Sequence, residues 1–342
     1  MDISQSLAVE TTQRLLSEQC TDAVLAAADS GIWQQALWDQ LAEFGLPVSL
    51  VGEDQGGIDL SIAEAFAIFR AAGRVALPLP IVETVLANWL LSRAGLEPFE
   101  GPASLVDGAA LNLSAKNGGW HLGGTAPRVP WGRRADIVVL AGGQVARVGR
   151  AGITVAEGTN LADEPRDGLT FDAQLENAAV ADLPDGTDLM AVLAAARCNQ
   201  MAGAMERIFE LTTAYVLERE QFGRPLAKFQ AIQQNLAVLA EQVAASNAAA
   251  EMATEALEGA MSRMAVGAAK TRIGEAAGMV AAIAHQAVGA MGVTQEFSLH
   301  HLTRRLWSWR EEYGNETYWA REIGLATAKL GPDGLWPAIT AV

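Results

Sequence analysis

The most informative residues of this chain lie in the segment 218–230, which reads E-R-E-Q-F-G-R-P-L-A-K-F-Q. It places the guanidinium of Arg219, the amides of Gln221 and Gln230 and the ring of Phe222 at a break between two helical stretches. A guanidinium can donate two parallel hydrogen bonds to a diphosphate, and an aromatic ring offers a flat surface. This combination predicts a site for an anion that also carries a flat group, such as the dinucleotide FAD.

The same segment has a purely structural interpretation. Arg219 could pair with Glu218 or Glu220 on a solvated helix end, and Phe222 could fill a position in the core. The isolated motif leaves both interpretations open.

A second group of candidate residues lies at 284–292, which reads A-H-Q-A-V-G-A-M-G. Glycine permits a positive φ and a close approach of the backbone to a ligand. Gln286 and Gly289 are therefore candidates for ligand contacts. The alternative, which does not exclude the first, is that Gly289 or Gly292 only ends a helix.

Composition limits the kind of partner that this chain can have. Of its 342 residues 50% are hydrophobic, and 40 acidic against 24 basic residues give a formal net charge of −16. The length allows a sizeable core in two or three domains or in one large multi-layer domain, and the hydrophobic content argues against disorder. The acidic balance argues against nucleic acid or an anionic membrane as the main partner.

The cysteines and histidines give no sign of a metal centre. Cys20 and Cys198 are far apart, so we expect small core residues in a reducing cytosol. His285 is expected in the core or at an interface, and His300 and His301 on a helix surface. No cluster has the spacing of metal ligands. We find no signal-peptide pattern and no stretch that approaches the ~20 apolar residues of a membrane span, which predicts a cytoplasmic protein.

Three zones of different composition follow one another along the chain. The first has helical periodicity, and the second has short β-type runs, such as 136–140 and 152–155, separated by Gly and Pro. In the third, apolar residues repeat at intervals of three and four, which predicts long helices packed as a bundle. The predicted fold is mainly α with a small central β domain. Its domains are an N-terminal helical domain (1–100), a β-barrel-like middle domain (101–186) and a C-terminal four-helix bundle (187–342).

These motifs resemble those of the acyl-CoA dehydrogenase family. The segment 218–230 is similar to the family's R-x-x-F-G-x-x-x-x-x-x-Q signature, and the order of the three zones is that of the family's fold. Near the N-terminus, W-D-Q-L-A-E-F-G-L at 38–46 and E-D-Q-G-G at 53–57 resemble two further family segments. A-G-R at 72–74, followed by two nearby prolines, resembles a subgroup that acts on bulky, often steroid-derived, acyl-CoAs.

The resemblance implies a flavoprotein that introduces an α,β double bond into an acyl-CoA, with FAD at a subunit interface of a dimer or tetramer. Arg219 would bind the pyrophosphate of a neighbouring subunit's FAD, Gln221 and Phe222 would pack along the dinucleotide, and Gln230 would hydrogen-bond to it. Gln286 and Gly289 would belong to the family's Q-x-x-G-G-x-G turn, which contacts the adenosine and phosphates. An electron-transfer flavoprotein is the electron acceptor that the resemblance implies.

Two family features are missing from this chain. The family's β domain opens with T-E-P-x-x-G-S-D, but residues 101–113 contain nothing comparable. In one branch of the family a glutamate in a Y-E-G-T turn removes the α proton, and Tyr313 stands at that position here. Glu312, one residue away, is the best remaining candidate for the base. The alternative is that Glu311 and Glu312 are solvated or pair with Arg310.

Both gaps resemble the shorter subunits of two-chain acyl-CoA dehydrogenases, in which a longer partner supplies the base. We therefore expect the subunit of a hetero-oligomer that lacks the usual base. The alternatives are a self-sufficient homo-oligomer that uses Glu312 as the base, a flavin monooxygenase, and a non-catalytic scaffold on the same fold.

Overall fold

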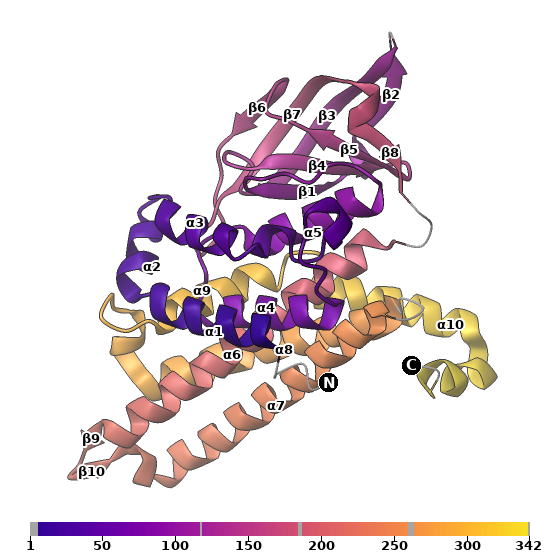
Figure 1. Ribbon diagram of the computed structural model, residues 1–342. Coiled ribbons are helices and arrows are strands. Elements are labelled where there is room, and N and C mark those ends of the chain that lie inside the picture. The colour runs from indigo at the N-terminus through magenta and orange to yellow at the C-terminus, as the bar shows by residue number, and fades with distance from the viewer. Residues whose placement is uncertain (1–5, 117, 184–186, 259–262, 341–342) are drawn as a thin grey trace. The chain divides into compact units, whose positions relative to one another are not determined.

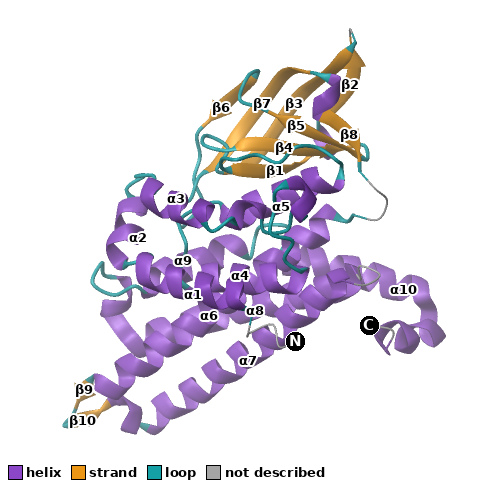
Figure 2. Ribbon diagram, in the orientation of Figure 1, coloured by secondary structure: helices purple, strands orange, loops and turns teal. Residues whose placement is uncertain are grey.

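The computed structural model describes residues 6–116, 118–183, 187–258 and 263–340 (Figures 1 and 2). Helices come first, then two β-sheets, then long helices. This order confirms the predicted mainly α fold with a central β region. The chain divides into two compact units: a helical unit of Met1–Ala26, Ile62–Leu77 and Met190–Val342, and a second unit of Ala27–Ser61 and Pro78–Leu189.

The helical unit is built from long helices that the Ala-rich sequence favours. Within it, α7 packs against α8, and α8 packs against α9 and α10. Its helices, with the last residues of α2 assigned to the second unit, are α1 (Leu7–Gln19), α2 (Asp22–Asp29), α4 (Ile62–Arg74), α6 (Leu189–Glu218), α7 (Gln230–Glu258), α8 (Arg263–Val288), α9 (Leu299–Trp309) and α10 (Glu316–Thr340). Two short strands, β9 (Glu220–Gln221) and β10 (Arg224–Pro225), and the 3-10 helices η6 (Leu226–Lys228) and η7 (Gly289–Val293) connect them.

Helices α4 and α6 approach each other at two glycines. A Cβ atom on Gly73 would lie 2.0 Å from the carbonyl oxygen of Gln200, and one on Gly203 would lie 1.9 Å from the carbonyl oxygen of Arg70. No side chain fits at either place. Arg70 of α4 also forms an ion pair with Glu206 of α6, so close packing and a salt bridge both join these two helices.

Helix α8 is a long apolar stretch. With the turn that follows it, Arg263–Val293, it is long and apolar enough to cross a membrane by length and composition. The expectation that no stretch has these properties is therefore wrong. The helix nevertheless packs against three other helices and buries Lys270, which are features of a core helix in a bundle.

The second unit contains both four-stranded sheets and the helices α3 (Gln35–Glu43) and α5 (Ile81–Arg93). One sheet has the order β1-β4-β5-β8, in which only the β1–β4 pair is parallel, and the other has the antiparallel order β2-β3-β7-β6. The strands are β1 (Ala103–Asp107), β2 (Asn112–Lys116), β3 (Gly119–Pro130), β4 (Asp136–Ala141), β5 (Gln144–Val148), β6 (Ile153–Ala156), β7 (Arg166–Leu175) and β8 (Val180–Asp182). Short 3-10 helices lie at η2 (Leu46–Val48), η3 (Glu53–Gln55), η4 (Gly108–Ala110) and η5 (Asn177–Ala179).

One hydrophobic core joins the two sheets. It includes Val106 of β1, Val139 of β4, Leu122 of β3 and Phe171 of β7. Inward-facing side chains of both sheets therefore pack together, as in a β-sandwich. The strands β4 and β6 coincide with the β-type runs 136–140 and 152–155, which confirms that part of the prediction.

The glycine contact predicts a large effect of one methyl group. Gly203→Ala should lower the free energy of unfolding by about 1–3 kcal/mol, because the added carbon must displace the α4 backbone. Gly324→Ala is the matched control: a Cβ there meets nothing within 4 Å inside α10, so the change should be neutral or stabilise by about 0.5–1 kcal/mol. Thermal unfolding of both variants measures the difference. Equal midpoints would contradict the close approach of α4 and α6.

Candidate functional site

The first candidate residues lie at the end of an arm formed by the last turns of α6 and the first turns of α7. The hairpin β9–β10 forms the tip of this arm (Figure 1). Gln221 pairs with Arg224, and Glu220 with Pro225. The amide of Leu226 donates to the carbonyl oxygen of Arg219 at 2.8 Å, which closes the base of the hairpin.

Phe222 and Gly223 form the two-residue turn of this hairpin. Their φ angles are +53° and +78°, and hairpin turns with positive φ at both positions follow the twist of the strands. Asn or Asp is the usual first residue of such a turn, whereas a bulky residue is strained there. The backbone leaves the ring of Phe222 91% exposed. Backbone strain of this kind is found at functional sites, which keeps the exposed ring of Phe222 a candidate for ligand contact.

The polar candidates of this segment are also exposed. Within the described residues the guanidinium of Arg219 makes no ion pair or hydrogen bond, and the same holds for the side chain of Gln230. Gln221 donates to the carbonyl oxygen of its neighbour Glu220, at 2.8 Å. The structure thus shows neither the pairing of Arg219 with its neighbouring glutamates nor a core position for Phe222.

Two rings and a cation gather beside the turn. Phe229 lies edge-to-face with Phe222 at 6.1 Å between centroids, and the guanidinium carbon of Arg224 lies 4.1 Å from the centre of the Phe229 ring. Leu217 and Val238 on the same arm are 59% and 40% exposed. The described chain therefore leaves much of the apolar surface of the arm uncovered.

The second group of candidates lies at the end of α8. Gln286 is exposed, and Gly289, which follows the helix, has a φ of +70°. A Cβ atom on Gly289 would meet nothing within 4 Å. Gly289 thus ends the helix, as the alternative predicted, and also leaves space for a ligand. Tyr215, one turn before Arg219, packs edge-to-face at 5.6 Å against Phe297, which lies between η7 and α9.

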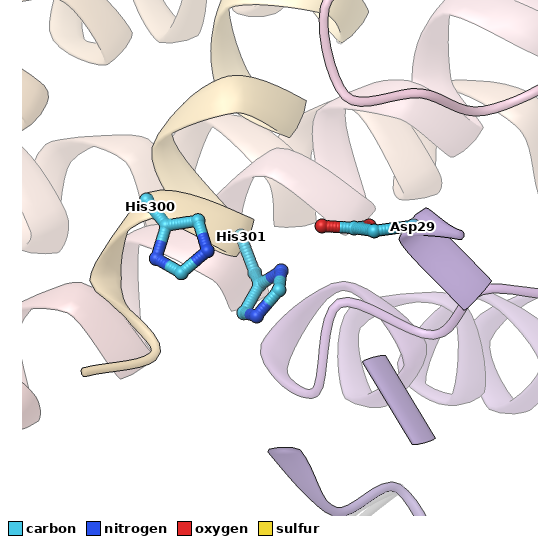
Figure 3. A group of neighbouring side chains, drawn as sticks. All are labelled: Asp29, His300 and His301. Atoms are coloured by element: carbon cyan, nitrogen blue, oxygen red, sulfur yellow. The ribbon is translucent and has the colours of Figure 1, made fainter. Parts of the chain in front are cut away.

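The histidines of this unit occupy packed positions. His285 bonds through Nε2 to the hydroxyl of Thr303 at 2.9 Å and stacks on Trp307, and burial lowers the pKa of its ring. His300 and His301 lie next to each other on α9, with ring centroids 4.0 Å apart (Figure 3). His301 is only 4% exposed, so the expectation of a helix surface is wrong for this residue.

Both cysteines are free thiols; Cys198 is buried, as expected for a core residue, whereas Cys20 is only partly buried. Burial raises the pKa of both Cys20 and Cys198 to about 12, which leaves both thiols protonated at neutral pH.

The candidate base Glu312 lies in a buried ion pair. Its Oε2 atom accepts from Nε of Arg197 at 2.8 Å and lies 2.8 Å from Nη2 of the same side chain. The Arg197 and Glu312 side chains are 2% and 10% exposed. The prediction that Glu312 is solvated or pairs with Arg310 is therefore wrong, because Arg197 needs a counter-charge in the interior. Glu311, by contrast, is half exposed and lies 3.7 Å from Arg310, as expected.

Sequence reasoning did not find Arg197. It is the single charged residue between 189 and 205, in a stretch rich in Ala and Met, and this isolation was the signal that could have revealed a buried cation. The guanidinium also lies over the rings of Tyr313 and Trp309, at 5.4 and 5.7 Å. Tyr313, at the position where the resemblance would place the family's glutamate, therefore packs on the same ion pair.

Comparison with known proteins covers most of the chain. The model of the acyl-CoA dehydrogenase N-terminal domain matches residues 4–98, and that of the C-terminal domain matches residues 186–323. Acyl-CoA dehydrogenase IpdE2 from Mycobacterium tuberculosis is 29% identical over 304 residues, which are 86% of this chain and 88% of that protein.

Solved structures share the fold at lower identity. A chain of the ChsE4–ChsE5 complex from Mycobacterium tuberculosis has a TM-score of 0.85 at 22% identity, covering 96% of this chain and 99% of that one. A chain of a variant of the Tcur3481–Tcur3483 steroid ACAD has a TM-score of 0.84 at 22% identity, covering 94% and 97%. With both family domains matched at their expected places, this chain belongs to the acyl-CoA dehydrogenase family of flavin-dependent oxidoreductases that act on acyl-CoA thioesters.

Proposed function

We propose that this chain is the subunit of a hetero-oligomeric acyl-CoA dehydrogenase that completes the FAD site of a partner subunit and does not supply the catalytic base. The partner would be a second, longer chain of the same family. The substrate would be a bulky acyl-CoA, for which a steroid-derived acyl group is the leading candidate.

The observation that carries this proposal is the exposure of the signature residues at the tip of the arm. Phe222 is 91% exposed, and the guanidinium of Arg219 has no partner among the described residues. A cation and a ring held this way suit a diphosphate and a flat group that come from another molecule. The uncovered Leu217 and Val238 suit contact with another subunit.

Bound FAD would accept the two electrons that leave the substrate in this reaction. The residues of this chain fit the part of the dinucleotide that projects from a neighbour. Arg219 would hold the diphosphate, Gln230 would bond to it, and Phe222 would cover an apolar face. The exposed side chain of Gln286 and the backbone at Gly289, which has open space beside it, would contact the adenosine end of the dinucleotide.

The place of the base argues for a partner. Removal of the α proton requires a carboxylate within hydrogen-bond reach of that carbon. In this chain Oε2 of Glu312 is already engaged by Arg197 at 2.8 Å, and Tyr313 stands where the family has glutamate. Freeing Glu312 would leave the buried Arg197 without its counter-charge, which costs several kcal/mol.

The substrate and partner classes follow from the relatives. One structural neighbour is a steroid ACAD, and another is a complex of two differently named chains. We propose the same assembly type here, with an electron-transfer flavoprotein as electron acceptor and a cytoplasmic location. The alternatives are a self-sufficient homo-oligomer, a flavin monooxygenase and a scaffold, and each predicts a different flavin content or a different substrate.

Flavin content and native mass of the assembly test the proposal directly. The chain purified alone should lack the visible absorbance of flavin, and the chain co-expressed with a longer acyl-CoA dehydrogenase from the same genome should bring flavin into a mixed oligomer. Full flavin occupancy in a homo-oligomer would favour the self-sufficient enzyme. A mixed oligomer whose flavin content is independent of this chain would favour the scaffold. Turnover of a substrate without CoA, with oxygen consumed, would favour the monooxygenase.

Arg219→Ala should weaken FAD retention by the mixed oligomer. Loss of a charge-assisted partner of the diphosphate costs about 1.5–3 kcal/mol, or roughly 10- to 150-fold in affinity. The control is Arg207→Ala, which removes a half-exposed arginine of the same helix that pairs with Glu210. Flavin content after dialysis reports the result, and equal retention by both variants would refute this role for Arg219.

Glu312→Gln should leave the specific activity of the mixed oligomer nearly unchanged and lower its melting temperature, because the amide keeps a hydrogen bond to Arg197 but loses the charge. Loss of a general base would instead cost about 10²–10⁴-fold in rate. Glu311→Gln, at a half-exposed position next door, is the control for both readouts. A collapse of activity with an intact fold would identify Glu312 as the base.

A further inference from the structure

Lys270 is a buried cation that the proposed function does not use. It lies on α8 with 1% of its surface exposed. Its ammonium group donates to the backbone carbonyl oxygens of Arg310 at 2.8 Å, Gly314 at 2.9 Å and Trp309 at 3.4 Å. Carbonyl groups at a helix C-terminus lack intrahelical partners, and a cation there also interacts favourably with the helix dipole. Lys270 thus joins the end of α9 to the far side of the turn before α10.

This turn holds Tyr313 in a conformation that a bulky residue does not favour. Tyr313 has a φ of +55° and Gly314 one of +87°, and a bulky residue at positive φ is strained. A side chain at Gly314 would come within 2.6 Å of Trp319, so the turn also packs tightly. Trp319 donates through Nε1 to the carbonyl oxygen of Tyr313 at 2.9 Å. Contacts from outside the turn must therefore hold it.

We propose that Lys270 is a positioning residue that sets the conformation of the turn between α9 and α10 and thereby keeps Glu312 against Arg197. The inference deepens the proposed function. It depends on that function only in the statement that Glu312 does not act as the catalytic base. It explains why an amine donor is kept in the interior of α8, where three carbonyl groups accept from it. An apolar side chain of similar size would fill the space but leave the carbonyl groups of Arg310 and Gly314 without this donor.

The protonation of Lys270 should make the opening of the turn depend on pH. Burial lowers the pKa of Lys270 to about 8; the Cys198 thiol and the carboxylates of Glu316 and Glu312 oppose the shift, and Arg197 adds to it. Opening of the turn would hydrate the amine and return its pKa toward about 10.4. The open turn then binds the proton more tightly than the closed one. Opening therefore becomes less favourable as the pH rises from 8 toward 10, by up to about tenfold per pH unit.

Hydrogen exchange of the turn amides tests this inference. The amides of Glu311 and Glu312 donate to the carbonyl oxygens of Ser308 and Trp309, each at 3.2 Å, and report on opening. Lys270→Met should speed their exchange at pH 7 by at least tenfold. In the wild-type chain, protection corrected for intrinsic exchange should rise between pH 8 and 10, and in Lys270→Met it should be flat. Lys329→Met, at an exposed lysine of α10, should keep the wild-type rates and pH profile.

Each outcome decides the matter. Unchanged or slower exchange in Lys270→Met at pH 7 would overturn the proposal, since the buried charge would then be only tolerated. If Lys270→Met does not fold, the exchange of Lys270→Gln at pH 7 decides, with faster exchange than in the wild type in support and unchanged exchange against. Exchange is measured whether or not flavin is bound, so its result is independent of the flavin content that tests the proposed function.

Discussion

The burial of one guanidinium constrains much of the helical unit. Arg197 lies on an otherwise uncharged stretch of α6 with 2% of its side chain exposed, and such a charge is stable in the interior only with a counter-charge and hydrogen bonds. Glu312 provides the counter-charge from 115 residues further along the chain. The segment after α9 must therefore return to α6, and the rings of Trp309 and Tyr313 pack over the pair. The ion pair, the turn after α9 and the packing of the two rings therefore depend on one another.

The arm at the other end of α6 differs from this buried region, because its side chains are largely exposed. Leu217 and Val238 on this arm are exposed within the described chain, and the hairpin turn holds Phe222 away from any core position. One helix thus begins near a buried ion pair and ends in an exposed ring. The contrast between the buried ion pair and the exposed tip is what the proposed contact with a second subunit requires: a packed interior and a surface that is free to bind.

The sequence predicted the parts of the structure that depend on local chemistry. Periodicity and composition predicted the order of helices and strands, and the runs 136–140 and 152–155 coincide with β4 and β6. The apolar residues that repeat at intervals of three and four include Leu239 and Val243 of α7, and both are buried. The first turns of that helix are more exposed because they belong to the arm.

Long-range pairings could not be predicted in this way. Nothing near Glu312 in the sequence indicates that its partner is Arg197, and nothing near Lys270 shows that its ammonium meets the carbonyl groups of a turn 40 residues away. Such contacts depend on how helices cross, and the crossing of α4 and α6 in turn depends on two glycines without room for a side chain. The strained turn at Phe222 was hidden for another reason, since Phe-Gly is not a usual hairpin sequence.

The uncovered tip also has a consequence for the free chain in the cell. An exposed apolar patch favours non-specific association, and here the formal net charge of −16 opposes it by mutual repulsion between free chains. Repulsion of this kind keeps copies of the same chain apart but does not prevent docking on a surface of complementary charge. In a hetero-oligomer of the proposed type, the acidity of the sequence would favour unlike subunits over like ones, and a property of the whole surface would contribute to the choice of partner.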